Sequence, residues 1–192
     1  TSTFNLTLPI NKDTKWGIQA CDSDNVCAFS SNRSVFIDTL KPTITLNYPS
    51  QVVSIGALGQ NISLNYTITD TRLVQSCWYK YDGLTNVTIP CNDNSSLILG
   101  TQKSIIMYAN DSVGNLNTTI FNWNYNVFEN SRQYNSSVSE TTRQSFVLNT
   151  TFDTSNYISS SATFYYDTVA YSTTKSYDGL NTIFTSSVTM PS

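Results

Sequence analysis

Alternation of apolar and polar residues dominates the middle of the chain. Residues 61–69 read Asn-Ile-Ser-Leu-Asn-Tyr-Thr-Ile-Thr. The apolar residues of this stretch share one face, and they are Ile62, Leu64, Tyr66 and Ile68. A period of two predicts a half-buried β-strand. Further strands are expected at residues 77–81, 87–91, 104–109 and 116–125. Because no stretch shows sustained helical periodicity, the pattern predicts an all-β protein with no significant helix.

The four cysteines fall into two local pairs, and apolar pairing supports one of them. Folded as a hairpin centred on Leu84, residues 77–91 form three facing pairs on one side of a sheet: Cys77 with Cys91, Tyr79 with Ile89, and Tyr81 with Val87. The second pair, Cys21 with Cys27, flanks a turn-rich segment and would close another hairpin. The alternative, four cysteines around a metal, lacks both histidine and C-x-x-C spacing. Disulfides indicate an extracellular protein.

Two internal matches indicate repeated modules. Residues 16–23 lie over residues 105–112 at an offset of 89, and Tyr-Asp-Gly-Leu at 81–84 recurs at 177–180 at an offset of 96. Each offset suits one small sandwich domain. The segment 38–44 contains Pro42 and is interpreted as a linker. We therefore expect a complete domain at 39–125, flanked by incomplete domains at 1–38 and 126–192.

The two flanking parts have complementary strand sets. Residues 1–38 are expected to hold three closing strands, at 4–8, 16–20 and 27–37. Residues 126–192 are expected to hold opening and middle strands, with a hairpin near Asp167-Thr168 and a strand with Phe146, Leu148, Thr150 and Phe152 on one face. Two explanations fit these incomplete ends. Either the 192 residues are a segment of a longer array of such domains, or one copy completes the next in a head-to-tail polymer, which is the hypothesis that we favour. The contact residues would be Trp16, Ile18 and Ala20 against Phe146, Leu148 and Phe164. The similarity of Thr7-Leu8-Pro9 to Thr189-Met190-Pro191 counts against a clean split of one domain.

Four segments carry a resemblance to the immunoglobulin-like repeats of archaeal and bacterial surface proteins: residues 20–23, 38–42, 76–79 and 108–115. The resemblance implies tandem antiparallel immunoglobulin-like sandwiches that act as spacers, stalks or fibre subunits. Both expected disulfides are local, so we expect no inter-sheet disulfide of the kind found in antibody domains. This difference argues against an antigen-receptor domain.

Composition narrows the classes of function. The formal net charge is −3 and only 12% of residues are charged, which disfavours nucleic acid as a partner. The chain has no histidine, the commonest general base and metal ligand, so we expect no enzyme, cofactor or resident metal. Asp22-Ser23-Asp24-Asn25 has too few ligands for calcium and is explained by a turn. No apolar run approaches the roughly 18 residues of a membrane span.

Ten N-x-S/T sequons suggest N-linked glycans. They are at Asn5, Asn32, Asn61, Asn65, Asn86, Asn94, Asn110, Asn117, Asn135 and Asn149. Ser and Thr make up 54 of 192 residues, so the 21 Asn would give about six sequons by chance. Asn61, Asn65 and Asn86 are expected to face solvent and carry sugar.

Together these patterns predict a glycosylated extracellular or cell-surface protein, and they leave two functions open. The first is a structural fibre subunit that binds copies of itself. The second is a spacer or binding module of an adhesin or viral fibre that contacts a host surface or carbohydrate.

Overall fold

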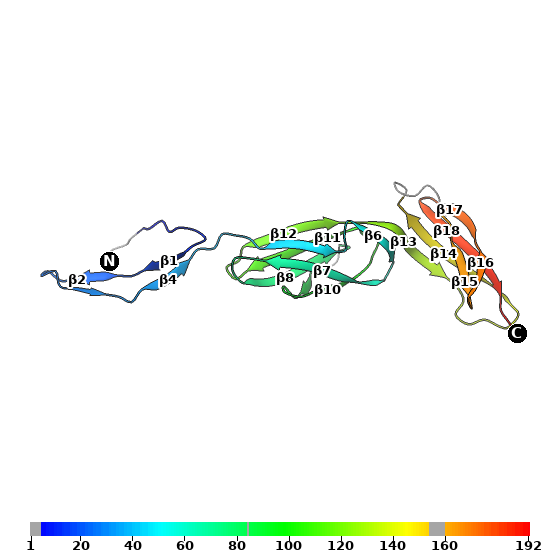
Figure 1. Ribbon diagram of the computed structural model, residues 1–192, viewed down its shortest axis with the longest axis horizontal. Helices are drawn as coiled ribbons and strands as arrows, with labels where there is room; N and C mark the ends of the chain where they lie inside the picture. Colours follow the sequence, from blue (N-terminus) through cyan, green and yellow to red (C-terminus); the bar gives the residue numbers. More distant parts are fainter. Residues whose placement is uncertain (1–4, 84, 154–159) are drawn as a thin grey trace.

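The computed structural model describes residues 5–83, 85–153 and 160–192. The described residues form strands and no helix, which confirms the predicted all-β class. Figure 1 shows three parts in a row: an N-terminal pair of hairpins, a central sandwich and a tilted C-terminal unit. The strands are β1 (Asp13–Trp16), β2 (Gln19–Cys21), β3 (Cys27–Phe29), β4 (Arg33–Phe36), β5 (Thr43–Tyr48), β6 (Val52–Ala57), β7 (Asn61–Thr69), β8 (Val74–Tyr81), β9 (Val87–Ile89), β10 (Ser95–Ile98), β11 (Ser104–Asp111), β12 (Leu116–Asn122), β13 (Asn124–Gln133), β14 (Arg143–Phe152), β15 (Thr163–Tyr166), β16 (Val169–Ser172), β17 (Thr174–Asp178) and β18 (Asn181–Thr189).

The central part is an antiparallel sandwich of the immunoglobulin-like type. One sheet has the order β10-β7-β5 and the other has the order β12-β11-β8-β9. The apolar face predicted for residues 61–69 is buried, as are Ile105, Met107 and Ala109 of β11. These residues belong to one hydrophobic cluster with Trp123 and Tyr125. Two sheets that bury alternate residues against each other give this fold its core.

The hairpin at residues 77–91 has a different register from the predicted one. Cys77 lies opposite Ile89, and Tyr79 lies opposite Val87, so the hairpin is centred on Gly83. The turn residues Asp82 and Gly83 both have positive φ, at 56° and 68°. A slip of two residues keeps every side chain on its original face, because side chains alternate along a strand. The apolar pattern alone therefore could not choose between the two registers.

Both predicted disulfides are present. Cys77 bonds Cys91, which lies just beyond β9, and Cys21 bonds Cys27 across the β2–β3 hairpin. Since a two-residue slip leaves both sulfurs of the first pair on one face, the bond survives the change of register.

The C-terminal unit shares a strand with the sandwich. β13 pairs in parallel with β6 and antiparallel with β14, giving a sheet of order β17-β18-β14-β13-β6. The strand thus runs across residue 125, where the sequence places a domain boundary. The division into 1–38, 39–125 and 126–192 stays a prediction.

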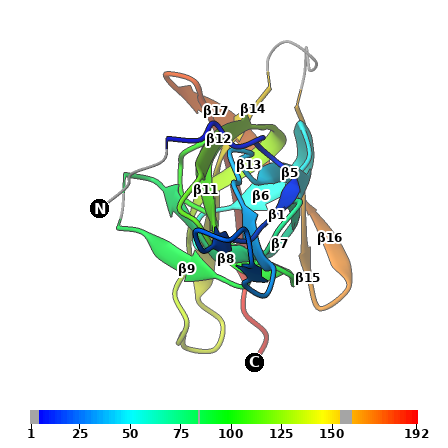
Figure 2. The same cartoon turned by 90° about the vertical axis from the view of Figure 1, so that its left-hand side faces the viewer.

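A separate hairpin, β15–β16, lies beside this sheet and turns at Asp167-Thr168, as expected from the sequence. In Figure 2 the hairpin extends to one side of the central strands. The match of residues 81–84 to 177–180 does not relate equivalent turns. The first turn joins β8 to β9 in one sheet of the sandwich, whereas the second joins β17 to β18 in the sheet β17-β18-β14-β13-β6 (the long sheet). A four-residue turn motif is reused wherever a tight reversal is needed.

The N-terminal part consists of two short ladders, β1–β4 and β2–β3. The predicted strand at 4–8 is absent over residues 5–8, and Phe4 lies outside the described residues. The predicted strand at 16–20 is interrupted at Gly17 and Ile18, because the Ser30 hydroxyl accepts the Ile18 amide proton at 2.8 Å. The predicted strand at 27–37 is likewise divided into β3 and β4.

Candidate docking surfaces

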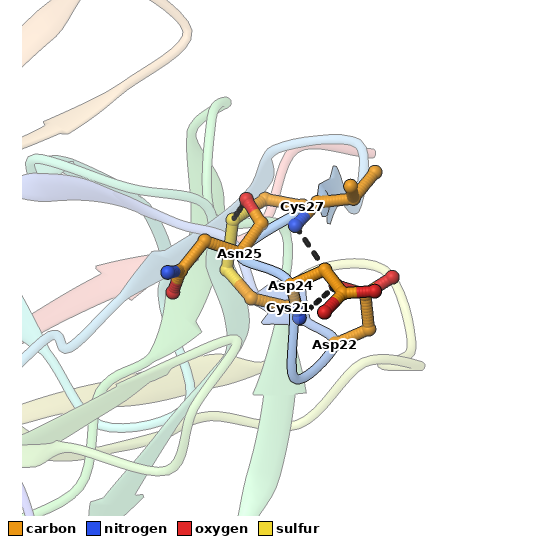
Figure 3. The surroundings of a disulfide bond; sticks show 6 residues. Cys21, Asp22, Asp24, Asn25 and Cys27 are labelled. Carbon is orange, nitrogen blue, oxygen red and sulfur yellow. Dashed lines mark hydrogen bonds between the residues drawn. A yellow bond between two sulfur atoms is a disulfide. The ribbon is translucent and has the colours of Figure 1, made fainter.

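The N-terminal β2–β3 hairpin repeats the turn of the β11–β12 hairpin. Asp22 Oδ1 accepts the amide protons of Asp24 at 3.0 Å and Val26 at 2.9 Å, as Figure 3 shows beside the disulfide. Asp111 Oδ1 accepts the amide protons two and four residues further on in the same way, at 2.9 and 2.8 Å. These bonds explain Asp22-Ser23-Asp24-Asn25 as a turn stabilised by its first side chain. Among the described residues, no group of three or more acidic, cysteine or histidine side chains could hold a metal.

Asp111 is a buried carboxylate with a perturbed pKa. Burial alone would raise the pKa, but hydrogen bonds from the Asn115 side chain and from the amides of Asn115, Val113 and Gly114 outweigh it and lower the pKa. The charged form is therefore stabilised in the folded state, and the turn depends on it.

The two hairpins also share their register. Subtracting 89 from the β11–β12 pairs gives the β2–β3 pairs: Tyr108↔Thr118 becomes Gln19↔Phe29, Ala109↔Asn117 becomes Ala20↔Ala28, and Asn110↔Leu116 becomes Cys21↔Cys27. Turn, register and sequence offset agree over residues 19–29, so these residues are the structural counterpart of residues 108–118. Trp16 keeps the sequence offset to Ile105, but it pairs with Arg33 rather than Asn32, so the register shifts by one residue there. The disulfide Cys21–Cys27 occupies the place of the pair next to the turn.

The counterparts differ in burial. Ile105, Met107 and Ala109 are 0% exposed in the sandwich. Their N-terminal equivalents are Trp16, at 42% exposure, Ile18, at 60%, and Ala20, which is also exposed. Arg33 lies 5.8 Å from the centre of the Trp16 ring and covers it only in part. The face that β11 buries in the core is thus open to solvent on β1 and β2.

The C-terminal unit carries an apolar groove of about 440 Å³. The groove runs between the long sheet and the β15–β16 hairpin, and the residues that line it include Phe146, Leu148, Phe164 and Phe184. Phe146 stacks on Phe164 with ring centres 4.4 Å apart. The structure therefore brings together Phe146, Leu148 and Phe164, the three residues that the sequence places on one side of the subunit contact.

The rim of the groove includes charged residues that sequence reasoning missed. Arg132 of β13 donates to Glu129 through Nε at 2.5 Å and through a terminal nitrogen at 2.9 Å. The hydrogen bonds and the charge of Glu129 raise the pKa of Arg132. The predicted boundary at residue 125 falls inside β13, so the sequence did not indicate that the rest of this strand forms a wall of the groove.

The joint between the N-terminal hairpins and the sandwich is held by a few side chains. Arg72 forms an ion pair with Asp13 at 3.0 Å and lies over the Phe36 ring at 3.7 Å from its centre. Asn115 and Asn117 donate to the linker carbonyls of Asp38 at 3.2 Å and Pro42 at 2.8 Å. These contacts fix the linker but leave the apolar face of β1 and β2 uncovered.

The sequons divide by exposure. Those at Asn5, Asn32, Asn61, Asn86, Asn94 and Asn135 are exposed, whereas Asn65, Asn110, Asn117 and Asn149 are half-buried. Asn65, which the sequence predicts to face solvent, is half-buried and lies in β7 opposite Tyr48 of β5. Asn117 uses Nδ2, the atom to which a glycan would be attached, to bind the Pro42 carbonyl.

No family model matches the chain, and no curated protein matches it either. Solved structures resemble it weakly. A complex titled Dpr2 Ig1-Ig2 with DIP-Theta Ig1-Ig3 gives a TM-score of 0.35 at 8% identity, over 94% of this chain and 64% of the other. The I-band fragment I67-I69 of titin gives 0.35 at 12%, over 77% and 55%. The four N-terminal Ig domains of Dscam1 isoform 6.44 give 0.28 at 14%, over 88% and 45%. The chain spans less than two thirds of each matched chain.

The described residues also include no helix with the length and apolar character needed to cross a membrane.

Proposed function

We propose that the chain is a structural subunit of a glycosylated extracellular fibre or cell-surface assembly, joined head to tail by strand complementation. The observation that supports it is the exposure of Trp16, Ile18 and Ala20, whose counterparts in the sandwich are fully buried. An immunoglobulin-like module is stable because both apolar faces are covered. A hairpin that repeats the turn and register of β11–β12 but lacks its partners is suited to complete another module.

The receiving surface is the C-terminal groove. Its walls present Phe146, Leu148 and Phe164, and its volume of about 440 Å³ is large enough for several apolar side chains. The N-terminal hairpins and the C-terminal groove lie in different parts of the chain (Figure 1). Two copies joined by one contact therefore still present free hairpins at one end and a free groove at the other. Such a heterologous contact grows into a fibre unless its rotation closes a ring.

The remaining features suit an exposed assembly outside the cell. Two disulfides form and persist in an oxidising compartment. Glycans on the exposed sequons would shield a β-surface with few charges from edge-to-edge pairing. The proposal involves no catalysis, cofactor or nucleic acid.

The alternative is a binding module of an adhesin or viral fibre. Tyr165 and Tyr177 favour it, because they are 66% and 67% exposed and an exposed aromatic ring can stack on a sugar. Under this alternative the open groove receives a host protein or carbohydrate rather than a second copy.

Negative-stain microscopy and light scattering of the secreted protein distinguish the two functions. Filaments with a regular repeat, growing with protein concentration, support the fibre subunit. A species that remains monomeric at all concentrations contradicts it and leaves the binding module.

A further inference from the structure

The β15–β16 hairpin corresponds to two strands of the second sheet of the sandwich. β8 ends in Tyr81 before a turn in which Asp82 and Gly83 have φ of 56° and 68°. β15 ends in Tyr166 before a turn in which Asp167 and Thr168 have φ of 43° and 66°. A second strand follows each turn and pairs antiparallel with the first. Positive φ at two successive residues is uncommon, and in both hairpins it directly follows the tyrosine that ends the first strand. The turns differ in length, because β15–β16 closes at Tyr166↔Val169 and the last pair of β8–β9 is Tyr79↔Val87. β15 is therefore equivalent to β8, at an offset of 85.

The long sheet completes the correspondence. In the sandwich, the sheet β10-β7-β5 is covered by the sheet that contains β8. In the C-terminal unit, the run β18-β14-β13 has the same antiparallel order and is covered by β15–β16. β8 has β9 on one side and β11 on the other, whereas β15 pairs with β16 alone among the described residues.

The groove lies where β11 would be. Its lining comes mainly from β13, β14, β15 and β18, which correspond to β5, β7, β8 and β10 of the sandwich. There the space is filled by Ile105, Met107 and Ala109, which are completely buried. The missing neighbour of β15 is thus a strand of the β11 type. Among the described residues, residues 16–23 repeat β11 in sequence, and β2 within them also repeats its turn and register.

We infer that the free edge of β15 pairs antiparallel with β1 and β2 of a second copy of this chain in the register of β8 with β11. The template pairs are Ile105↔Tyr81, Tyr108↔Trp78 and Met107↔Tyr79. Subtracting 89 from the first residue number of each pair and adding 85 to the second gives the expected contact. Trp16 then lies opposite Tyr166, Gln19 opposite Thr163, and Ile18 opposite Phe164. The inference rests on the proposed function and adds the strand, the direction and the register of the contact.

The facing pair Gln19 and Thr163 allows a direct test. Both residues are exposed, so replacing them removes no buried side chain, although Thr163 also borders the groove. A disulfide requires Cα atoms no more than about 6.8 Å apart, which directly opposed strand residues satisfy. The variants Gln19→Cys and Thr163→Cys are purified separately, mixed and oxidised, and linked peptides are identified by mass spectrometry.

In the control, the Gln19→Cys variant is mixed with a Ser172→Cys variant instead of the Thr163→Cys variant. Ser172 is exposed and lies opposite Thr163 on β16, one strand further from the proposed edge. Two strand spacings of about 4.8 Å separate it from an incoming β2, which is too far for a bond. The expected result is that the peptide linking positions 19 and 163 is at least ten times more abundant than the peptide linking positions 19 and 172, with neither variant linking to itself.

The outcomes separate the two proposals. Filaments without preferential linking of positions 19 and 163 overturn the register but leave the fibre intact. Absence of any association by light scattering overturns the fibre and the register together. Self-linking of the Gln19→Cys variant indicates a symmetric contact between two donor hairpins and also overturns the inference.

Discussion

Replacing Ile18 by Ala should weaken assembly without weakening the isolated chain. Ile18 is 60% exposed in one copy, and its counterpart Met107 is fully buried. Burying a whole aliphatic side chain contributes about 1.5–3 kcal/mol, so burying the exposed part of Ile18 contributes about 1–2 kcal/mol. Loss of that contribution corresponds to an association constant about five- to thirtyfold lower.

A matched control exists on the outer face of the sandwich. Ile120 of β12 is also 60% exposed, but it lies in neither the donor hairpin nor the groove. Ile120→Ala removes the same atoms from a surface site, where substitutions usually change stability by less than about 0.5 kcal/mol. We therefore expect it to leave the association constant unchanged.

Sedimentation velocity over a concentration series measures both variants beside the unmodified chain, and thermal unfolding at a concentration below association checks the fold. The expected result is a shift of the assembly midpoint for Ile18→Ala alone, with the unfolding temperature unchanged. Equal shifts for Ile18→Ala and Ile120→Ala, or none for either, would refute the idea that the exposed face of β1 and β2 is a contact surface.

Four further outcomes follow from the structure. Met107→Ala should lower the free energy of unfolding by about 2–5 kcal/mol in chemical denaturation, because it opens a cavity in the core. Replacing Cys77 and Cys91 together by Ala should cost about 3 kcal/mol in the same assay, since the bond closes a short loop. Asp111→Ala should lower the unfolding temperature at pH 7. Because the pKa of Asp111 is lowered in the folded state, its contribution to stability is complete above the ordinary value near 3.9 and declines as the pH falls through the folded pKa. Thermal unfolding from pH 7 to pH 2 should therefore show the difference between Asp111→Ala and the unmodified chain becoming smaller in acid. The intact mass of secreted protein should exceed 21.4 kDa, and Asn117→Gln should leave the glycan mass unchanged, because Asn117 Nδ2 is engaged with the linker.

Local patterns determined much of the fold. The alternation of residues 61–69 is a property of a single strand, and the structure buries the face that it marks. The pairing of Cys77 with Cys91 depends only on two strands joined by a short turn. The match between residues 16–23 and 105–112 likewise reflects one turn held by its own aspartate, which needs no distant partner.

The register of one hairpin and the contacts between distant segments were decided only in the tertiary structure. The register of the hairpin after Cys77 could not be read from the pattern, because a slip of two residues preserves every side-chain face. The sharing of β13 between two parts of the chain depends on β6 and β14, which lie about 70 residues before and 20 residues after it in the sequence. The groove combines residues from four strands, so no window of the sequence contains it. Whether Ile18 lies in a core or in solvent depends on which strands surround it, and for that reason the same motif is buried at residue 107 and open at residue 18.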